Sequence, residues 1–260
     1  MDYQHLKCIT PIDGRYSSKT EPLSDYFSEL SFNKYRILIE IEYLISLGKL
    51  EIYDDLDDNM TEFLRGIYKN FNLEECIKLK RSLNINENKF IILLPGRLTY
   101  WKGQKLFIES LNILNQKNSL KNVKSLIIGG DQGRVDFRNQ LTKMIKTYNL
   151  EDKLLIAHDL NKMPVAYSIA NLVLSSSIEP ESFGRVSVEA QSMEKPVLAS
   201  DIGGSLETVI NNKTGWLFKN NDANDLATKL EMIIKTQQNV LDLIGKQGRK
   251  NVKENYTREL

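Results

Sequence analysis

From about residue 88 onward, short apolar runs alternate with longer segments in which apolar residues recur at helical spacing. The runs are "KFIILLPG", "VKSLIIGG", "KLLIAH", "NLVLSSS" and "PVLASD". Such runs, bounded by glycine, proline and serine, are typical of strands buried in a parallel sheet, and the segments between them are typical of crossover helices. Five strand–helix units in succession predict an α/β fold with a doubly wound, Rossmann-like parallel sheet, whose ligands bind at the carboxyl ends of the strands.

The first 58 residues show a different pattern, with apolar residues at helical spacing followed by an acidic stretch, "EIYDDLDDNM". The apolar positions are Leu23, Phe27, Leu30, Ile37, Ile41, Leu44 and Ile45. Gly48 is a candidate C-cap for this helix. We therefore expect a short helical segment over residues 1–58 and an α/β domain over residues 59–260. The last part of the chain predicts one or two further helices, with Asp222 as the N-cap of the first.

The composition is that of an ordinary globular protein, with 41% hydrophobic and 27% charged residues over 260 positions. The formal net charge of +1 gives no electrostatic reason to expect nucleic acid as a partner. Cys8 and Cys76 lack metal-site spacing and the chain has two histidines, so a cysteine–histidine zinc site is not expected. No basic-then-apolar signal opens the chain, and its apolar runs are too short to span a bilayer. These features favour a cytoplasmic location.

Charged and glycine-rich segments follow the predicted strands, where a Rossmann-like sheet binds its ligand. Arg97 and Lys102 follow the first strand, and the fourth is followed by "SSSIEPESFGRVSVEA". Two cations facing a helix that begins at a glycine suit a diphosphate, because helix amides and the helix dipole add to the charge of Arg and Lys. A Walker A loop and a GxGxxG fingerprint are both absent from the sequence, which argues against a P-loop NTPase and a standard dinucleotide binder.

Each of these residues also has a simpler structural interpretation. Arg97 and Lys102 would then be solvated surface charges, and Glu189 an exposed helical carboxylate. The glycine pairs at 129–130 and 203–204 would be turn residues that need a positive φ, an interpretation we favour for the first pair. His158 would be a satisfied polar residue at a strand end. The functional interpretation gains weight because all of them fall on one edge of the predicted sheet.

From about residue 62 to 256 the sequence resembles the nucleotide-binding, C-terminal domain of retaining GT-B glycosyltransferases of the family 4 type. The resemblance rests on "GRLTYWKG", "LIIGG", the two glutamates of "ESFGRVSVE", and the following "AQSMEKPVLASDIGGSLETV" and "GWLF". It implies three catalytic residues. Arg97 and Lys102 would contact the donor diphosphate, and Glu181 would lie beside the donor sugar.

The same resemblance implies a set of donor-binding residues, in which backbone amides after a tight turn meet the sugar and phosphate. Glu189 would hold the ribose hydroxyls. The full set is Gly129, Gly130, Phe183, Gly184, Arg185, Val186 and Glu189. No metal and no cofactor are implied, because Arg and Lys can stabilise the charge on a departing nucleoside diphosphate.

The resemblance further implies partners and a mechanism. The donor would be a nucleoside-diphosphate sugar, transferred with retention of anomeric configuration by same-face attack. Family members also carry an N-terminal acceptor-binding domain, to which nothing before about residue 59 is similar, so we expect a separate acceptor domain as a partner. Many relatives act on lipid acceptors, which leaves open a peripheral association with the inner face of the membrane.

The first 58 residues resemble the extreme N-terminus of bacterial adenylosuccinate lyase. The similar stretch begins "LKCITPIDGRYSSKTEPLSDYF", and its "DGRY" segment would lie near the substrate phosphate in that family. A turn with a surface arginine is the simpler interpretation, because the flexible catalytic loop of the lyases occurs nowhere in the chain. The leading hypothesis is thus a glycosyltransferase donor-binding domain fused to a short lyase-like segment. The alternatives are a nucleotide-binding module that is inactive alone and a lyase-type oligomerisation fragment.

Overall fold

The computed structural model describes residues 38–46, 60–62, 64, 73–83, 85, 89–157 and 163–256. The chain divides into two compact units, one comprising Met1–Leu73 and Arg258–Leu260 and the other Glu74–Thr257. The described part of the first unit includes a helical stretch over residues 38–46, in which Ile41 and Ile45 are buried. The predicted boundary after residue 58, and most of the segment that resembles the lyases, lie outside the described residues.

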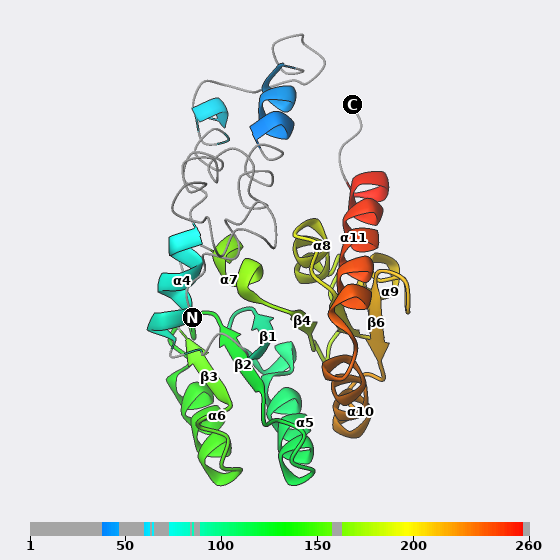
Figure 1. The fold of residues 1–260 in the computed structure, drawn as a ribbon. Coiled ribbons are helices and arrows are strands. Elements are labelled where there is room, and N and C mark those ends of the chain that lie inside the picture. The colour runs from blue at the N-terminus through cyan, green and yellow to red at the C-terminus, as the bar shows by residue number, and fades with distance from the viewer. Residues whose placement is uncertain are drawn as a thin grey trace, which may run out of the picture. The chain divides into compact units, whose positions relative to one another are not determined.

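The second unit is built on a parallel sheet whose six strands are arranged in the order β3-β2-β1-β4-β5-β6 (Figure 1). The strands are β1 (Phe90–Pro95), β2 (Val123–Ile128), β3 (Leu154–Ala157), β4 (Leu172–Ser175), β5 (Val197–Ser200) and β6 (Gly215–Phe218). In the register, Leu93 of β1 is opposite Leu126 of β2 on one side and Val173 of β4 on the other. The predicted α/β fold with a doubly wound parallel sheet is confirmed. A sixth strand adds to the five that the apolar runs predict.

Helices cover both faces of this sheet, as the alternation of side chains along β1 requires. Ile92 and Leu94 point into one cluster of buried residues, and Ile91 and Leu93 into the other. The first cluster includes side chains of α5 (Gln104–Gln116), α6 (Val135–Thr147), α10 (Ala223–Ile234) and α11 (Gln238–Asn255). The second includes side chains of α7 (Met163–Ile169) and α8 (Arg185–Ser192), and partly buried side chains of α4 (Leu73–Ser82) pack against it.

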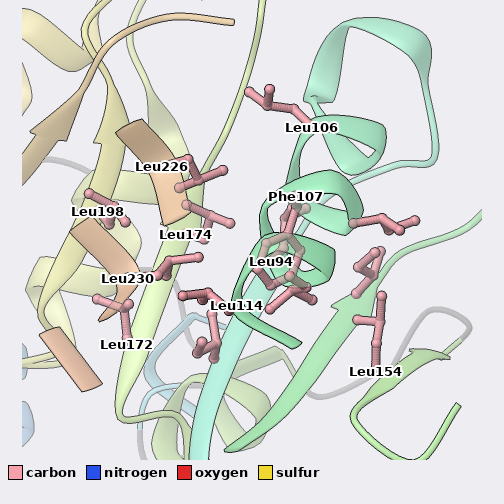
Figure 2. Packing of buried hydrophobic residues seen from close by; sticks show 14 of the residues in the cluster. Leu94, Leu106, Phe107, Leu114, Leu154, Leu172, Leu174, Leu198, Leu226 and Leu230 are labelled. Carbon is pink, nitrogen blue, oxygen red and sulfur yellow. The ribbon is translucent and has the colours of Figure 1, made fainter. Parts of the chain in front are cut away.

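The first cluster is centred where α5 and α10 pack on the middle of the sheet (Figure 2). Phe107 and Leu114 of α5 lie there with Leu174 of β4, Leu226 of α10 and Leu198 of β5. These side chains are fully buried. Burial of each of these side chains contributes roughly 1.5–3 kcal/mol to the stability of the fold, so the packing holds the helices against the strands.

The strand order changes direction at the neighbouring strands β1 and β4, and their following segments enter opposite faces of the sheet. After β1 the chain enters α5 on one face, and after β4, which lies beside β1, it enters α8 on the other. Such a switch point leaves a crevice at the carboxyl ends of the two strands. The functional site is therefore expected where the loops after β1 and β4 meet.

The C-terminal helices follow the prediction. Asp222 is the N-cap of α10, and its carboxylate accepts hydrogen bonds of 3.0 Å from the backbone N–H groups of Asn224 and Asp225. In the part of the chain that the structure describes, no helix has the length and apolar character needed to cross a membrane.

Candidate functional site

A glycine allows the loop after β1 to pack closely against the loop after β4. Gly103 has φ +73°, and a Cβ atom there would overlap the backbone carbonyl oxygen of Ser176. The Ser176 hydroxyl in turn donates a hydrogen bond of 3.1 Å to the carbonyl oxygen of Lys102. Because only glycine allows this approach, the position of Lys102 at the crevice depends on the residue that follows it.

Lys102 forms an ion pair with Glu181 across the switch point. The Lys102 Nζ lies 2.7 Å from Glu181 Oε1, and the side chains are only 13% and 15% exposed. The Ser177 hydroxyl donates to the same carboxylate oxygen. Ser177 is itself held in place, because its carbonyl oxygen accepts a 2.7 Å hydrogen bond from the Ser200 hydroxyl of β5. Two residues predicted to be catalytic are thus in direct contact, although they lie on loops after different strands.

The loop after β5 packs against the backbone around Glu181 through two glycines. A Cβ at Gly203 would lie 2.7 Å from the carbonyl oxygen of Glu181, and one at Gly204 would lie 2.5 Å from the carbonyl carbon of Phe183. The Gly204 N–H also donates to that Glu181 carbonyl oxygen at 2.7 Å. This glycine pair therefore permits a close approach of two backbones and fixes the segment that leads into α8.

Helix α8 begins at this crevice, and its N-terminus lacks a side-chain cap. Its N-cap, Gly184, has φ +74°, and its first turn contains no acidic residue. The N–H groups of Arg185 and Val186 are among the first amides of the helix, which have no partner within it. The preceding Phe183 is 46% exposed, and its ring meets Tyr256, the C-cap of α11, edge-on with ring centroids 5.7 Å apart. An anion would find both donors and the positive end of a helix dipole here.

Glu189 lies one turn further along α8 and has two side-chain partners. Arg185 Nη2 lies 3.1 Å from Oε1, and the Tyr167 hydroxyl donates a hydrogen bond of 2.8 Å to Oε2. Burial, together with the neighbouring carboxylate, raises the pKa of Tyr167 well above its ordinary value, so the hydroxyl stays protonated and acts as a donor. The sequence analysis missed Tyr167, because its helical spacing in "KMPVAYSIA" marks it only as a core position.

The residues after β1 and β2 form the other side of the crevice. Arg97 is exposed, and its Nη1 donates to Gln132 Oε1 at 3.4 Å. The two predicted diphosphate cations therefore contact different loops: Arg97 reaches the loop after β2, and Lys102 the loop after β4. His158 lies outside the described residues.

Gly129 and Gly130 bring the loops after β1 and β2 together. A Cβ at Gly129 would overlap the carbonyl oxygen of Gly96, and the Gly130 carbonyl oxygen accepts a 3.0 Å hydrogen bond from Leu98 N–H. Neither Gly129 nor Gly130 has a positive φ. The interpretation of this pair as positive-φ turn residues is thus wrong, and close packing of two backbones explains Gly129.

Among the described residues, no group of three or more His, Cys, Asp and Glu side chains is arranged to hold a metal ion. The charged groups described at the crevice include Arg97, Lys102, Arg185 and the two glutamates. This set can bind an anion next to a group rich in hydroxyls, because guanidinium and ammonium groups hold phosphate oxygens and carboxylates accept hydroxyl hydrogen bonds.

Adenylosuccinate lyases are one set of relatives. That of Legionella pneumophila (strain Corby) is 41% identical over 78 residues, which is 29% of this chain and 17% of the lyase. The match is short, and the placement of the lyase-like segment at residues 1–58 stays a prediction.

Other relatives include glycosyltransferases. The capsular polysaccharide biosynthesis glycosyltransferase CapM of Staphylococcus aureus is 29% identical over 220 residues, which cover 82% of this chain and 53% of CapM. The crystal structure of a glycosyltransferase from Rickettsia africae superposes with a TM-score of 0.67 at 32% identity, covering 73% of this chain and 49% of that one. The structure of Anabaena Alr3699/HepE in complex with UDP-glucose superposes with a TM-score of 0.65 at 26% identity, covering 71% and 49%.

This chain thus spans about half the length of the glycosyltransferases that it matches. The family model described as "Glycosyl transferases group 1" matches residues 77–251, which include Arg97, Lys102, Glu181 and Glu189. The chain therefore belongs to the glycosyl transferases group 1 family.

Proposed function

We propose that the chain binds a nucleoside-diphosphate sugar at the crevice between β1 and β4 and provides the donor-binding part of a retaining, metal-independent glycosyltransferase. The observation that carries the proposal is the Lys102–Glu181 ion pair, which places a cation and a carboxylate side by side at the switch point of the sheet. The structural relative HepE, in complex with UDP-glucose, supports this class of donor.

The diphosphate is assigned to the unshielded start of α8 and to the two cations of the loop after β1. The first amides of α8 donate hydrogen bonds to phosphate oxygens, and Lys102 and Arg97 supply full positive charge. As the sugar departs, negative charge grows on the nucleoside diphosphate. Lys102 and Arg97 stabilise that charge without a metal ion, because they are already in place before the bond breaks.

The sugar and the ribose are assigned to the two glutamates. Glu181 lies beside the cation that holds the diphosphate, so its carboxylate is placed to accept hydrogen bonds from hydroxyls of the transferred sugar. Glu189 lies along α8 from the phosphate-binding turn and accepts hydrogen bonds from the ribose hydroxyls. Same-face attack by an acceptor hydroxyl, with the leaving phosphate taking its proton, retains the anomeric configuration.

Titration calorimetry of the purified chain tests donor binding. We expect one of UDP, GDP and ADP, and its sugar conjugate, to bind equally well with magnesium and with EDTA. Arg97→Ala and Glu189→Ala should each weaken that binding about tenfold or more, as expected for loss of a charged hydrogen-bond partner. The matched control Lys121→Ala removes a charge before β2, at the opposite edge of the sheet, and should leave binding unchanged. Binding that survives both site substitutions contradicts the assignment.

Transfer is measured separately from binding. Incubation of the chain with the bound donor, with and without candidate acceptors, should release the nucleoside diphosphate, and NMR of the product should show the anomeric configuration of the donor. An inverted product contradicts the retaining mechanism. Binding without any turnover supports the second candidate function, a nucleotide-binding module that needs a separate acceptor-binding partner.

A further inference from the structure

Tyr167 of α7 places a polar group in a position where the fold needs only an apolar one. Its side chain is 3% exposed and belongs to the buried cluster that includes Ala166, Val173 and Ala190. Its hydroxyl donates its single hydrogen to Glu189 Oε2 at 2.8 Å. A phenylalanine would fill the same space, so the hydroxyl calls for an explanation beyond packing.

The second partner of Glu189 is a much weaker restraint on the carboxylate. Arg185 is 81% exposed and reaches Glu189 as an i,i+4 pair on the surface of α8. Such pairs contribute little, because solvent screens them and both long side chains must be ordered. Tyr167 has two side-chain torsions and is held by close packing, so its hydroxyl is a fixed point to which the more flexible glutamate is bound.

The two hydrogen bonds also determine which lone pairs of the carboxylate stay available. An ionised carboxylate accepts about four hydrogen bonds, two on each oxygen. Tyr167 uses one position on Oε2 and Arg185 one position on Oε1. One acceptor position is left on each oxygen, which is the arrangement that two adjacent hydroxyls of a ribose require. A carboxylate free to rotate would bind one hydroxyl in many orientations.

We propose that Tyr167 is a positioning residue that orients the Glu189 carboxylate and so makes the site select a ribonucleotide over its 2′-deoxy counterpart. This inference rests on the proposed function, in which Glu189 holds the ribose. It adds a residue on a different helix, and it assigns the sugar selectivity of the nucleotide site to that residue.

The test compares the dissociation constants of the ribonucleoside diphosphate that binds best and of its 2′-deoxy form, measured by calorimetry. The wild-type chain should prefer the ribonucleotide about tenfold or more, as expected for a hydrogen bond to a charged group. Tyr167→Phe removes one oxygen atom and keeps the ring. The substitution should weaken binding of the ribonucleotide several-fold and leave binding of the deoxy form nearly unchanged. The preference for the ribonucleotide should therefore fall to about twofold or threefold.

Two further variants serve as controls. Tyr148→Phe removes a tyrosine hydroxyl at the C-terminal end of α6, which lies at the amino edge of the sheet, and should leave both constants unchanged. Arg185→Ala removes the exposed, weaker partner of Glu189 and should preserve most of the preference for ribose, because the Tyr167 hydroxyl still holds Oε2. Since Arg185 is on the surface, this variant tests the proposal even where Tyr167→Phe does not fold.

An unchanged ribose preference in folded Tyr167→Phe overturns the inference, and so does a collapse of that preference in Arg185→Ala. A wild-type chain that binds no nucleoside diphosphate overturns the proposed function instead. Equal weakening of both nucleotides by Tyr167→Phe assigns the residue a general structural role and also contradicts the proposal.

Discussion

The Lys102–Glu181 ion pair leads to predictions for stability and for binding that diverge when both charges are removed. Lys102→Met leaves the Glu181 carboxylate, which is 15% exposed, with the Ser177 hydroxyl as its described partner. Breaking an exposed pair costs up to about 1 kcal/mol, and breaking a fully buried one about 3–5 kcal/mol. At this partial burial we expect a loss of about 2 kcal/mol in the free energy of unfolding. For a domain of this size, that corresponds to a melting temperature lower by about 4–8 °C.

The double variant separates the two roles of the pair. Lys102→Met combined with Glu181→Gln removes both charges, so its stability loss should be smaller than the sum of the two single losses, by about 1 kcal/mol or more. Nucleoside-diphosphate binding should not recover, because the double variant still lacks the cation. We expect affinity to fall about tenfold to a hundredfold in both variants that lack Lys102.

The measurements are thermal unfolding by calorimetry and nucleotide titration, both made on the wild type, the two single variants and the double variant. Additive stability losses would show that the ion pair is not energetically coupled. Recovered binding in the double variant would show that Lys102 contacts only Glu181 and no ligand. The first result would refute the stabilising role of the ion pair, and the second would refute the assignment of Lys102 to the donor site.

Three further predictions concern the fold that supports the site. Gly103→Ala should lower the free energy of unfolding by at least about 2 kcal/mol, because the added Cβ meets the Ser176 carbonyl. The control Gly133→Ala should cost only about 1 kcal/mol, because Gly133 also has a positive φ, +82°, but no atom lies within 4 Å of its added Cβ. Equal losses for the two variants in thermal unfolding would contradict the close approach at Gly103. Phe107→Ala should lower the free energy of unfolding by about 3–5 kcal/mol in urea titrations, with a clearly smaller loss for Phe107→Leu, since the side chain is fully buried. The backbone N–H groups of Asp225 and Asn224 hold the pKa of Asp222 below its ordinary value, so the carboxylate stabilises the fold above about pH 4 and this contribution is lost as the pH falls through the lower, folded pKa. Asp222→Ala should therefore have a lower melting temperature than the wild type at pH 7, and this difference in melting temperature should become smaller in acid. A difference that grows in acid would contradict the role of Asp222 as the cap.

The sequence predicts the parallel sheet because its strands are buried on both faces. Continuous apolar runs such as that of β1 have no other common interpretation when helical segments separate them. The strand β6 was harder to predict, since "GWLF" is short and follows the single helical turn of α9 (Ser205–Thr208). Its pairing with β5 is a tertiary feature, in which Trp216 is opposite Leu198.

The sequence also predicts which edge of the sheet holds the charged residues, but not their partners. Lys102 and Glu181 are 79 residues apart in the sequence, and their contact depends on β1 and β4 being neighbours. The same holds for Tyr167 and Glu189, whose helices face each other only after both have packed on the sheet. Periodicity places a residue on a face of its own element, whereas a side-chain contact between elements depends on the order of the strands.

The central claim is that a nucleoside-diphosphate sugar binds between β1 and β4, and a crystal structure of the chain with its best-binding nucleotide tests it most directly. The account predicts diphosphate oxygens at hydrogen-bonding distance, about 3 Å, from Lys102 Nζ and from the first backbone amides of α8, with the ribose hydroxyls on Glu189. A nucleotide bound elsewhere on the molecule, or bound at α8 with its ribose turned away from Glu189, would contradict it.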